Sequence, residues 1–69
     1  SEFWPYGIKR AGWSSEQFCE LISSLFTHYL DPKGTNEFCS TDSFSSMFER
    51  YTGPRDYTDI ILVNENWKQ

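Results

Sequence analysis

A helix start just after Trp13 restricts the fold of this chain more than any other local pattern. Ser14 and Gln17 have the spacing of a capping box, in which each side chain bonds the backbone N–H of the other residue. Trp13 and Phe18 flank the pair at the positions of a hydrophobic staple. We therefore predict a helix that begins at Ser15.

The residues that follow have the periodicity of an amphipathic helix. Apolar side chains recur at the i, i+3, i+4, i+7 spacing of one broad helical face, at Phe18, Leu21, Ile22, Leu25, Phe26 and Tyr29. Pro32 disfavours helical geometry at Asp31 and has no backbone N–H to donate. We expect the helix to end near Tyr29 or Leu30.

A second, shorter helix is predicted after residue 40. Ser40 or Thr41 is a suitable N-cap, and the next carboxylate suits the positive end of the helix dipole. Apolar residues at the helical spacing follow at Phe44, Met47, Phe48 and Tyr51. Gly53 fits a left-handed C-cap and Pro54 prevents continuation, so we expect the helix to stop there.

The two ends of the chain give weaker patterns. The run Ile60–Val63 is short, apolar and rich in β-branched residues, which favours a strand, while a helix stays open. For a strand, we expect pairing with Glu37–Cys39. The segment 3–13 has no period, so we expect an irregular aromatic arm that closes the core.

The size of the chain allows one domain with one small core. It has 69 residues, and its three Trp, four Tyr and six Phe predict a core built on rings. Residues 1–3, Ser-Glu-Phe, have the form of a cloning scar. We therefore expect residues 4–69 to be a single small helical domain excised from a longer protein.

Charge and cysteine content exclude several function classes. Six Lys and Arg against ten Asp and Glu give a net charge of -4 without a basic stripe, so we expect no nucleic-acid partner. No apolar run is long enough to span a bilayer, so we expect no membrane partner. Cys19 and Cys39 are expected to be thiols of an intracellular protein, in the cytoplasm or nucleus. A secreted effector with one disulfide stays open as an alternative.

The segment from Asp31 to Asp42 has the length of a calcium-binding loop but not its ligands. Lys33 stands at loop position 3, where its cation would repel a divalent ion. Asp42 stands at position 12, where it is one methylene shorter than the usual Glu. We therefore expect no metal and no other cofactor, and calcium sensing is an alternative function.

Asp31, Asn36, Phe38 and Asp42 carry a resemblance to a degenerate EF-hand, a helix-loop-helix without the ion, over about residues 15–52. The run 13–51 is also similar to a fungal domain of unknown function, which implies a helical module in a large regulatory protein. The fold expected from these patterns is mainly α. It is a small helical domain with two amphipathic helices, an EF-hand-like loop and a short two-stranded pairing.

No constellation of residues indicates catalysis. His28 is the single histidine, the serines have no nucleophile-elbow setting, and no phosphate-binding glycine motif occurs, so we expect no enzyme and no catalytic residue. Four aromatic residues outside the periodic faces are the predicted partner-binding residues: Trp4, Tyr6, Tyr57 and Trp67. We expect a non-catalytic protein-protein interaction module, an adaptor or scaffold. It would bind a peptide or helix of a partner protein, or form a homodimer.

Overall fold

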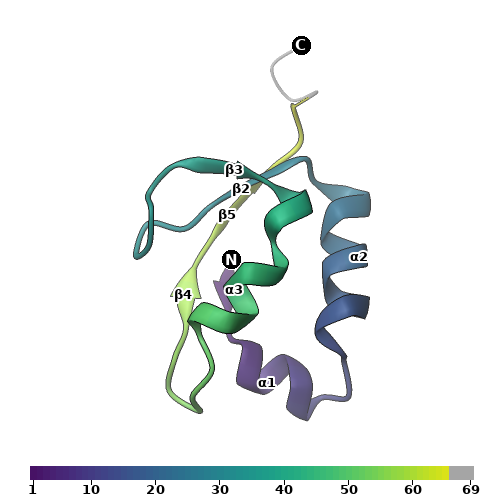
Figure 1. Ribbon diagram of the computed structural model, residues 1–69, viewed down its shortest axis with the longest axis vertical. Coiled ribbons are helices and arrows are strands. Elements are labelled where there is room, and N and C mark those ends of the chain that lie inside the picture. The colour runs from purple at the N-terminus through teal and green to yellow at the C-terminus, as the bar shows by residue number, and fades with distance from the viewer. Residues whose placement is uncertain (66–69) are drawn as a thin grey trace.

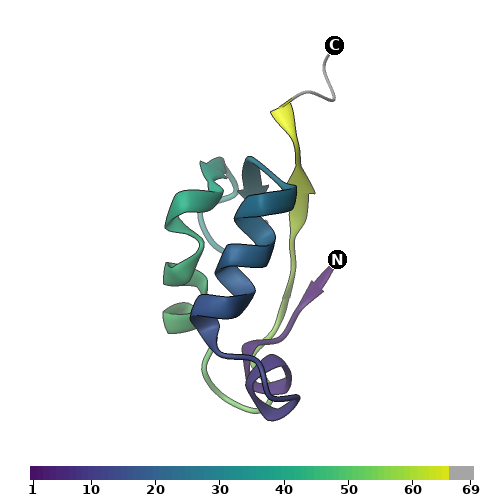
Figure 2. The same ribbon diagram turned by 90° about the vertical axis from the view of Figure 1, so that its right-hand side faces the viewer.

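Helices and two short antiparallel sheets form two layers in the computed structural model, which describes residues 1–65 (Figures 1 and 2). In chain order the elements are β1 (Glu2–Phe3), α1 (Pro5–Arg10), α2 (Ser15–Leu25), β2 (His28–Leu30), β3 (Phe38–Ser40), the 3₁₀ turn η1 (Thr41–Ser43), α3 (Ser45–Arg50), β4 (Thr58–Asp59) and β5 (Ile61–Val63). One sheet has the order β3-β2-β5 and the other pairs β1 with β4. The expectation of a mainly α fold is therefore wrong, because strands contribute a full layer.

The start of α2 is confirmed. The backbone N–H of Gln17 donates to Ser14 Oγ at 3.1 Å, and the backbone N–H of Ser14 donates to Gln17 Oε1 at 3.0 Å. The rings of Trp13 and Phe18 meet edge-on with their centroids 6.1 Å apart, as a hydrophobic staple requires. A complete cap therefore fixes where this helix begins.

The predicted end of α2 is wrong by about one turn. The helix stops at Leu25 because Phe26 is extended, with φ -134° and ψ 147°. The next residues form β2, the central strand, in which Tyr29 lies opposite Cys39 on one side and Leu62 on the other. Tyr29 is buried, as the helical pattern predicted, but as a strand residue. Two neighbouring strands outweigh the local period here.

The strand predicted near residues 60–63 is confirmed as β5, but its predicted partner is wrong. Glu37–Cys39 does not pair with it, since β2 lies between β3 and β5. The loop that was expected to join two helices instead joins β2 to β3 in an antiparallel pair. Asn36 turns this loop with a left-handed φ of 56°, as expected.

The second helical region begins as predicted and ends early. Ser40 Oγ accepts a hydrogen bond from the backbone N–H of Asp42 at 3.2 Å, and the chain passes through η1 into α3. The helix ends at Arg50, because Tyr51 is extended. Gly53 does not have a left-handed φ, so the predicted C-cap is wrong.

The expected irregular arm is also wrong, because it contains β1 and α1. Pro5 starts α1, where its missing N–H leaves no helical hydrogen bond unmade. Gly12, with φ 101°, lets the chain turn away after the helix. Ahead of α1, Glu2 and Phe3 pair with Asp59 and Thr58 of β4.

The core lies between the helices and the sheets, and aromatic rings fill most of it. Its buried members are Phe3, Ile22, Tyr29, Phe44, Met47, Phe48, Tyr51 and Ile60. The centroid of the Phe3 ring lies 5.1 Å from that of Phe44 and 5.2 Å from that of Phe48, and both contacts are edge-on. Residues 1–3 were interpreted as a cloning scar, which stays a prediction, yet Phe3 stands at the centre of this core.

The face of the three-stranded sheet that points away from the core has none of the helices of residues 1–65 over it (Figure 2). Leu30 lies opposite Phe38 on one side and Ile61 on the other, so the three share this outer sheet face. Phe38 is 54% exposed. The outer sheet face is therefore an apolar surface distinct from the core.

Candidate functional site

Three of the four predicted partner-binding residues lie on one side of the molecule. Trp4 directly precedes α1 and Tyr6 lies in its first turn, and their ring centroids are 5.9 Å apart. Tyr57 comes from the turn before β4 and borders the same hollow as Trp4. We call Trp4, Tyr6 and Tyr57 the aromatic surface; they are 37%, 39% and 50% exposed. Trp67, the fourth, lies outside the described residues.

The indole of Trp4 is held in place although its face is exposed. Its Nε1–H donates to the carbonyl oxygen of Pro54 at 3.0 Å, which ties α1 to the turn after α3. The ring lies over Gly7, where a Cβ atom would overlap it. The absence of a side chain at Gly7 therefore allows the indole to lie close against the helix.

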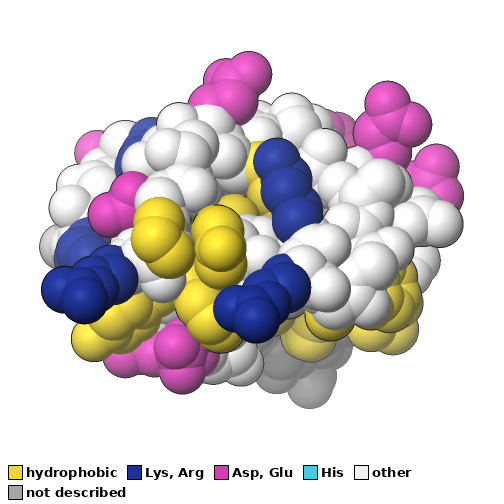
Figure 3. All heavy atoms as spheres, turned by 90° about the horizontal axis from the view of Figure 1, so that it is seen from below, with side chains coloured by type: hydrophobic (Ala, Val, Ile, Leu, Met, Phe, Trp, Pro, Cys, Tyr) yellow, Lys and Arg dark blue, Asp and Glu magenta, His cyan; other side chains and the backbone are white. Residues whose placement is uncertain are grey.

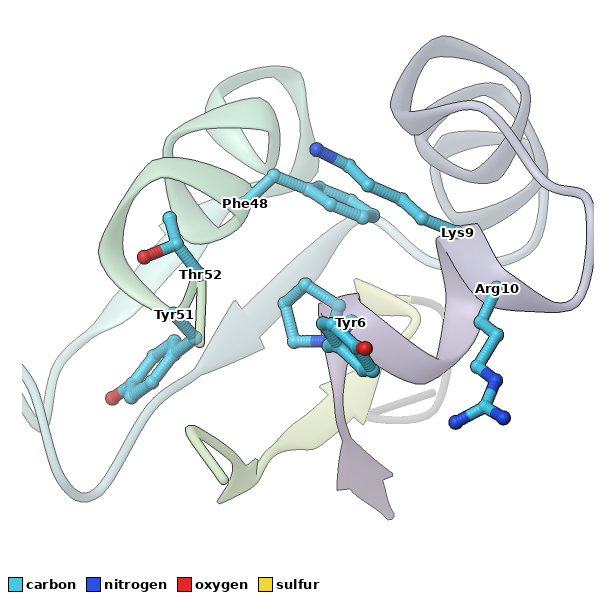
Figure 4. Close-up of a pocket in the computed structure, with 7 residues that line it drawn as sticks. Tyr6, Lys9, Arg10, Phe48, Tyr51 and Thr52 are labelled. Carbon is cyan, nitrogen blue, oxygen red and sulfur yellow. The ribbon is translucent and has the colours of Figure 1, made fainter. Parts of the chain in front are cut away.

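Besides a hollow of about 580 Å³ that Trp4 lines together with Gly7 and Trp13, two hollows adjoin the aromatic surface at its tyrosine residues. The first, which we call the Tyr57 hollow, has a volume of about 390 Å³ and is lined by Glu2, Trp4, Pro54, Arg55 and Tyr57. The second, the Phe48 hollow, has a volume of about 460 Å³ and is lined by Pro5, Tyr6, Lys9, Arg10, Phe48, Tyr51 and Thr52 (Figure 4). The Trp4–Tyr6 ring pair links them, since each ring lines one of the two.

Cations border this side of an acidic chain. Lys9 and Arg10 lie at the Phe48 hollow and Arg55 at the Tyr57 hollow, and none of the three forms an ion pair within residues 1–65. The ammonium of Lys9 lies 5.9 Å from the centre of the Phe48 ring. Figure 3 shows apolar side chains on this lower face with Lys and Arg side chains beside them. The local charge thus differs in sign from the net charge of -4.

The two tyrosine hydroxyls of the aromatic surface have no hydrogen-bond partner among residues 1–65. Neither Tyr6 nor Tyr57 uses its hydroxyl in a hydrogen bond to another described residue, whereas the buried Tyr51 donates its hydroxyl to Asp31 at 2.6 Å. An exposed phenol can donate to a carbonyl oxygen of a bound chain. The aromatic surface therefore offers both apolar area and uncommitted donors.

Asp31 lies behind this surface in a buried polar cluster. Its side chain is 1% exposed, and its carboxylate accepts four hydrogen bonds, from the Tyr51 hydroxyl at 2.6 Å, the Thr58 hydroxyl at 2.7 Å, the Arg50 guanidinium at 3.1 Å and the backbone N–H of Lys33 at 3.1 Å. Burial opposes ionisation, but these hydrogen bonds outweigh it and hold the Asp31 pKa below its ordinary value. We call these five residues the Asp31 cluster.

The Asp31 cluster gives the segment 31–42, which resembles a degenerate EF-hand loop, a structural role. Both carboxylate oxygens of Asp31 already accept hydrogen bonds from protein groups. Gly34 leaves the space in which the Arg50 guanidinium reaches this carboxylate, because a Cβ atom there would overlap it. Within residues 1–65, no group of three or more His, Cys, Asp or Glu side chains has an arrangement that could hold a metal ion.

Lys33 connects the Asp31 cluster to the aromatic surface. Its backbone N–H donates to Asp31, while its ammonium donates to the carbonyl oxygen of Tyr57 at 2.7 Å. The same ammonium lies 5.6 Å from the Tyr51 ring centre and 5.4 Å from that of Tyr57. One side chain therefore positions Tyr57 relative to the core.

The other sequence candidates have structural positions. His28 lies on β2, and its Nδ1 is 2.9 Å from Thr27 Oγ1. Cys19 and Cys39 are free thiols, and burial raises the pKa of Cys19. None of the helices in residues 1–65 has the length and apolar character needed to cross a membrane.

Sequence reasoning missed the cations of the site. Tyr6, Lys9 and Arg10 have the i, i+3, i+4 spacing of one helical face. Pro5 is the signal that could have revealed this face, because proline is favoured in the first turn of a helix. No family model, curated protein or solved structure matches this chain.

Proposed function

We propose that this protein is a non-catalytic interaction module that binds a peptide segment of a partner protein at the aromatic surface. The observation that carries the proposal is the gathering of Trp4, Tyr6 and Tyr57, from two separate segments, around two hollows. Exposed aromatic rings that line hollows are typical of binding energy concentrated in a few residues. Trp and Tyr also offer large contact areas with few rotatable bonds.

The aromatic surface is a better candidate than the outer sheet face. Both expose apolar side chains, but the aromatic surface adds cations and two hydroxyls with no hydrogen-bond partner in residues 1–65. The outer sheet face offers one cross-strand row of apolar residues, Leu30, Phe38 and Ile61, and a second row of His28, Ser40 and Val63, without Lys or Arg. Polar groups among apolar ones orient a ligand, so the mixture favours specific recognition.

Selection from a random peptide library displayed on phage tests the proposal. We expect the immobilised domain to enrich peptides whose binding is lost with Trp4→Ala or Tyr57→Ala, by tenfold or more in dissociation constant for a residue at the centre of an interface. Binding of the individual enriched peptides is measured by fluorescence polarisation. Amide NMR spectra of each variant establish that it remains folded.

Phe38→Ala is the matched control, because Phe38 is about as exposed as Tyr57 but belongs to the outer sheet face. It should leave peptide binding unchanged. Enriched peptides that bind the Trp4→Ala and Tyr57→Ala variants as tightly as the unchanged domain would contradict the proposal. Loss of binding only in Phe38→Ala would move the site to the outer sheet face.

A further inference from the structure

We infer that the segment recognised at the aromatic surface is extended and proline-rich, and that acidic residues follow at one end. This inference rests on the proposed function and names its ligand class. It draws on three features of the site. The first is an aromatic ridge, formed by the rings of Trp4 and Tyr6, between the two hollows. The others are the tyrosine hydroxyls, which have no hydrogen-bond partner in residues 1–65, and the cations beside the Phe48 hollow.

The ridge and hollows suit a polyproline II helix better than an α-helix. The Trp4–Tyr6 ring pair stands between the Tyr57 hollow and the Phe48 hollow. An α-helix, about 10 Å across, needs one uninterrupted groove, which this ridge breaks. In a polyproline II helix, residues i and i+3 project on the same side about 9 Å apart and can straddle a ridge.

Trp4, one of the two rings of the ridge, is held in place before a ligand binds. Trp4 is tied to Pro54 by its indole N–H and lies against Gly7. A side chain that is already fixed loses little freedom on binding, and a polyproline II segment is likewise preformed. Two preorganised partners are typical of proline-rich recognition.

The available donors match the needs of a proline-rich chain. A polyproline II helix has no internal hydrogen bonds, and its proline residues carry carbonyl acceptors but no N–H donors. The hydroxyls of Tyr6 and Tyr57 have no hydrogen-bond partner in residues 1–65, and each of the two residues lines one hollow. They can donate to carbonyls of the ligand on either side of the ridge.

The charges beside the two hollows indicate the orientation of the bound peptide segment. Lys9 and Arg10 both line the Phe48 hollow and have no ion-pair partner in the described residues. At the Tyr57 hollow, Arg55 is accompanied by the carboxylate of Glu2. An acidic end is therefore favoured beside the Phe48 hollow, with the proline residues crossing the ridge towards Tyr57.

The test uses a fluorescein-labelled probe of two Pro-Pro-Leu repeats followed by Asp-Glu-Glu. We expect it to bind at least about tenfold tighter than a probe with every proline replaced by alanine, and tighter than one with its acidic residues replaced by lysine. Trp4→Ala and Gly7→Ala should each weaken binding of the proline probe. Phe38→Ala should not.

The ligand class and the proposed function fail in different ways. If library selection yields binders that depend on Trp4 but the alanine probe binds as tightly as the proline probe, the proline inference is overturned and the peptide-binding function stands. If no binder depends on Trp4 or Tyr57, the proposed function itself fails. Gly7→Ala keeps every ring, so it tests the placement of the ridge even if Trp4→Ala does not fold.

Binding of either of two other partners, a single-stranded nucleic acid or a second copy of the chain, would overturn the inference. A single-stranded oligothymidine that binds in a Trp4-dependent manner, and more tightly than the proline probe, would overturn the inference in favour of nucleic acid. Self-association that Trp4→Ala abolishes, seen by sedimentation, would overturn it in favour of a second copy. A monomer that prefers the proline probe supports the inference.

Discussion

The aromatic surface and the Asp31 cluster are built in a similar way but differ in how their polar groups are paired. In each, a glycine leaves room for a large side chain: Gly7 for the indole of Trp4 and Gly34 for the guanidinium of Arg50. In the Asp31 cluster the polar groups satisfy one another. At the aromatic surface the Trp4 ring is fixed, but within residues 1–65 the cations have no ion-pair partner and the tyrosine hydroxyls have no hydrogen-bond partner. The difference separates a cluster that stabilises the fold from one suited to a ligand.

Asp31→Ala should have the largest effect, and on stability. It leaves the hydroxyls of Tyr51 and Thr58 without their acceptor in the core. Loss of one partner from such a buried cluster costs about 3–5 kcal/mol, a large part of the stability of a domain this small. Urea unfolding followed by Trp fluorescence measures this. A loss below about 1 kcal/mol would mean that the cluster is not the main polar support of the fold.

Stability should fall at acid pH through Asp31. Because hydrogen bonds keep the folded-state pKa of Asp31 below its ordinary 3.8, the contribution is present above that pH and is lost as the pH falls through the folded-state value. The melting temperature measured against pH should show this loss. Asp31→Asn should be less stable at neutral pH and should lack the part of the acid loss that comes from this carboxyl.

The same cluster predicts a loss at alkaline pH. Burial, and then the hydrogen bond to Asp31, raise the pKa of Tyr51 above its ordinary 10.0. Its contribution is present below pH 10 and is lost as the pH rises through the raised value. Tyr51→Phe should remove this part of the alkaline loss. An unchanged melting profile in that variant would show that Tyr51 does not couple stability to pH.

Gly7→Ala should affect binding more than stability. Alanine favours a helix over glycine by up to about 1 kcal/mol, but the new methyl group displaces the indole of Trp4. We expect peptide affinity to fall about tenfold, or about 1.4 kcal/mol, with little change in unfolding free energy. Fluorescence polarisation and urea unfolding of the same sample compare the two quantities. Unchanged affinity would mean that the position of the ridge is unimportant.

Gly34→Ala is the matching change in the other region and should have the reverse effect. Its methyl group would overlap the Arg50 guanidinium, which is partly exposed and can swing into water, and would also crowd the buried Oδ2 of Asp31, which cannot move away freely. We therefore expect a loss of at least about 1 kcal/mol in stability and no change in peptide affinity. An affinity loss equal to that of Gly7→Ala would erase the distinction between the two regions.

Lys33→Met should have the smallest effect and should measure how strongly the regions are connected. It removes the ammonium that bonds the Tyr57 carbonyl and lies over two rings, but keeps the backbone N–H that bonds Asp31. We expect less than about 1 kcal/mol in stability and a few-fold loss in peptide affinity. Relaxation measurements on the Tyr57 amide should show more motion in this variant.

Local patterns predicted the parts of the fold that depend on neighbouring residues. The start of α2 followed from Ser14 and Gln17, which are three residues apart. Its end did not, because Tyr29 fits a helical face and a buried strand equally well, and only pairing with two distant strands decides between them. Phe3 was set aside with the first residues, although long-range contacts place it at the centre of the core.

The candidate site was predictable to a similar extent. Trp4, Tyr6 and Tyr57 were selected because they lie outside the periodic faces, and the structure brings them together, while their role in binding a partner stays a prediction. Asp31 was interpreted as the first position of a degenerate EF-hand loop without an ion, and its role in the core was missed because its hydroxyl donors, Tyr51 and Thr58, are 20 and 27 residues away in the sequence. A local sequence pattern does not reveal a hydrogen-bond acceptor whose donors are this far away in the sequence.

The pairing between Ser1 and Ile60 has a consequence for the order in which the protein folds. The backbone N of Ser1 bonds the carbonyl oxygen of Ile60 at 2.9 Å, and the N–H of Ile60 donates back to Ser1 at 2.7 Å. During synthesis, β1 cannot pair until β4 has left the ribosome. Until then the Phe3 ring lacks its full packing. Tyr57 directly precedes β4 in the same segment. The pairing of β1 and the arrival of Tyr57 beside Trp4 therefore depend on one stretch of the chain, so the fold and the aromatic surface are completed together.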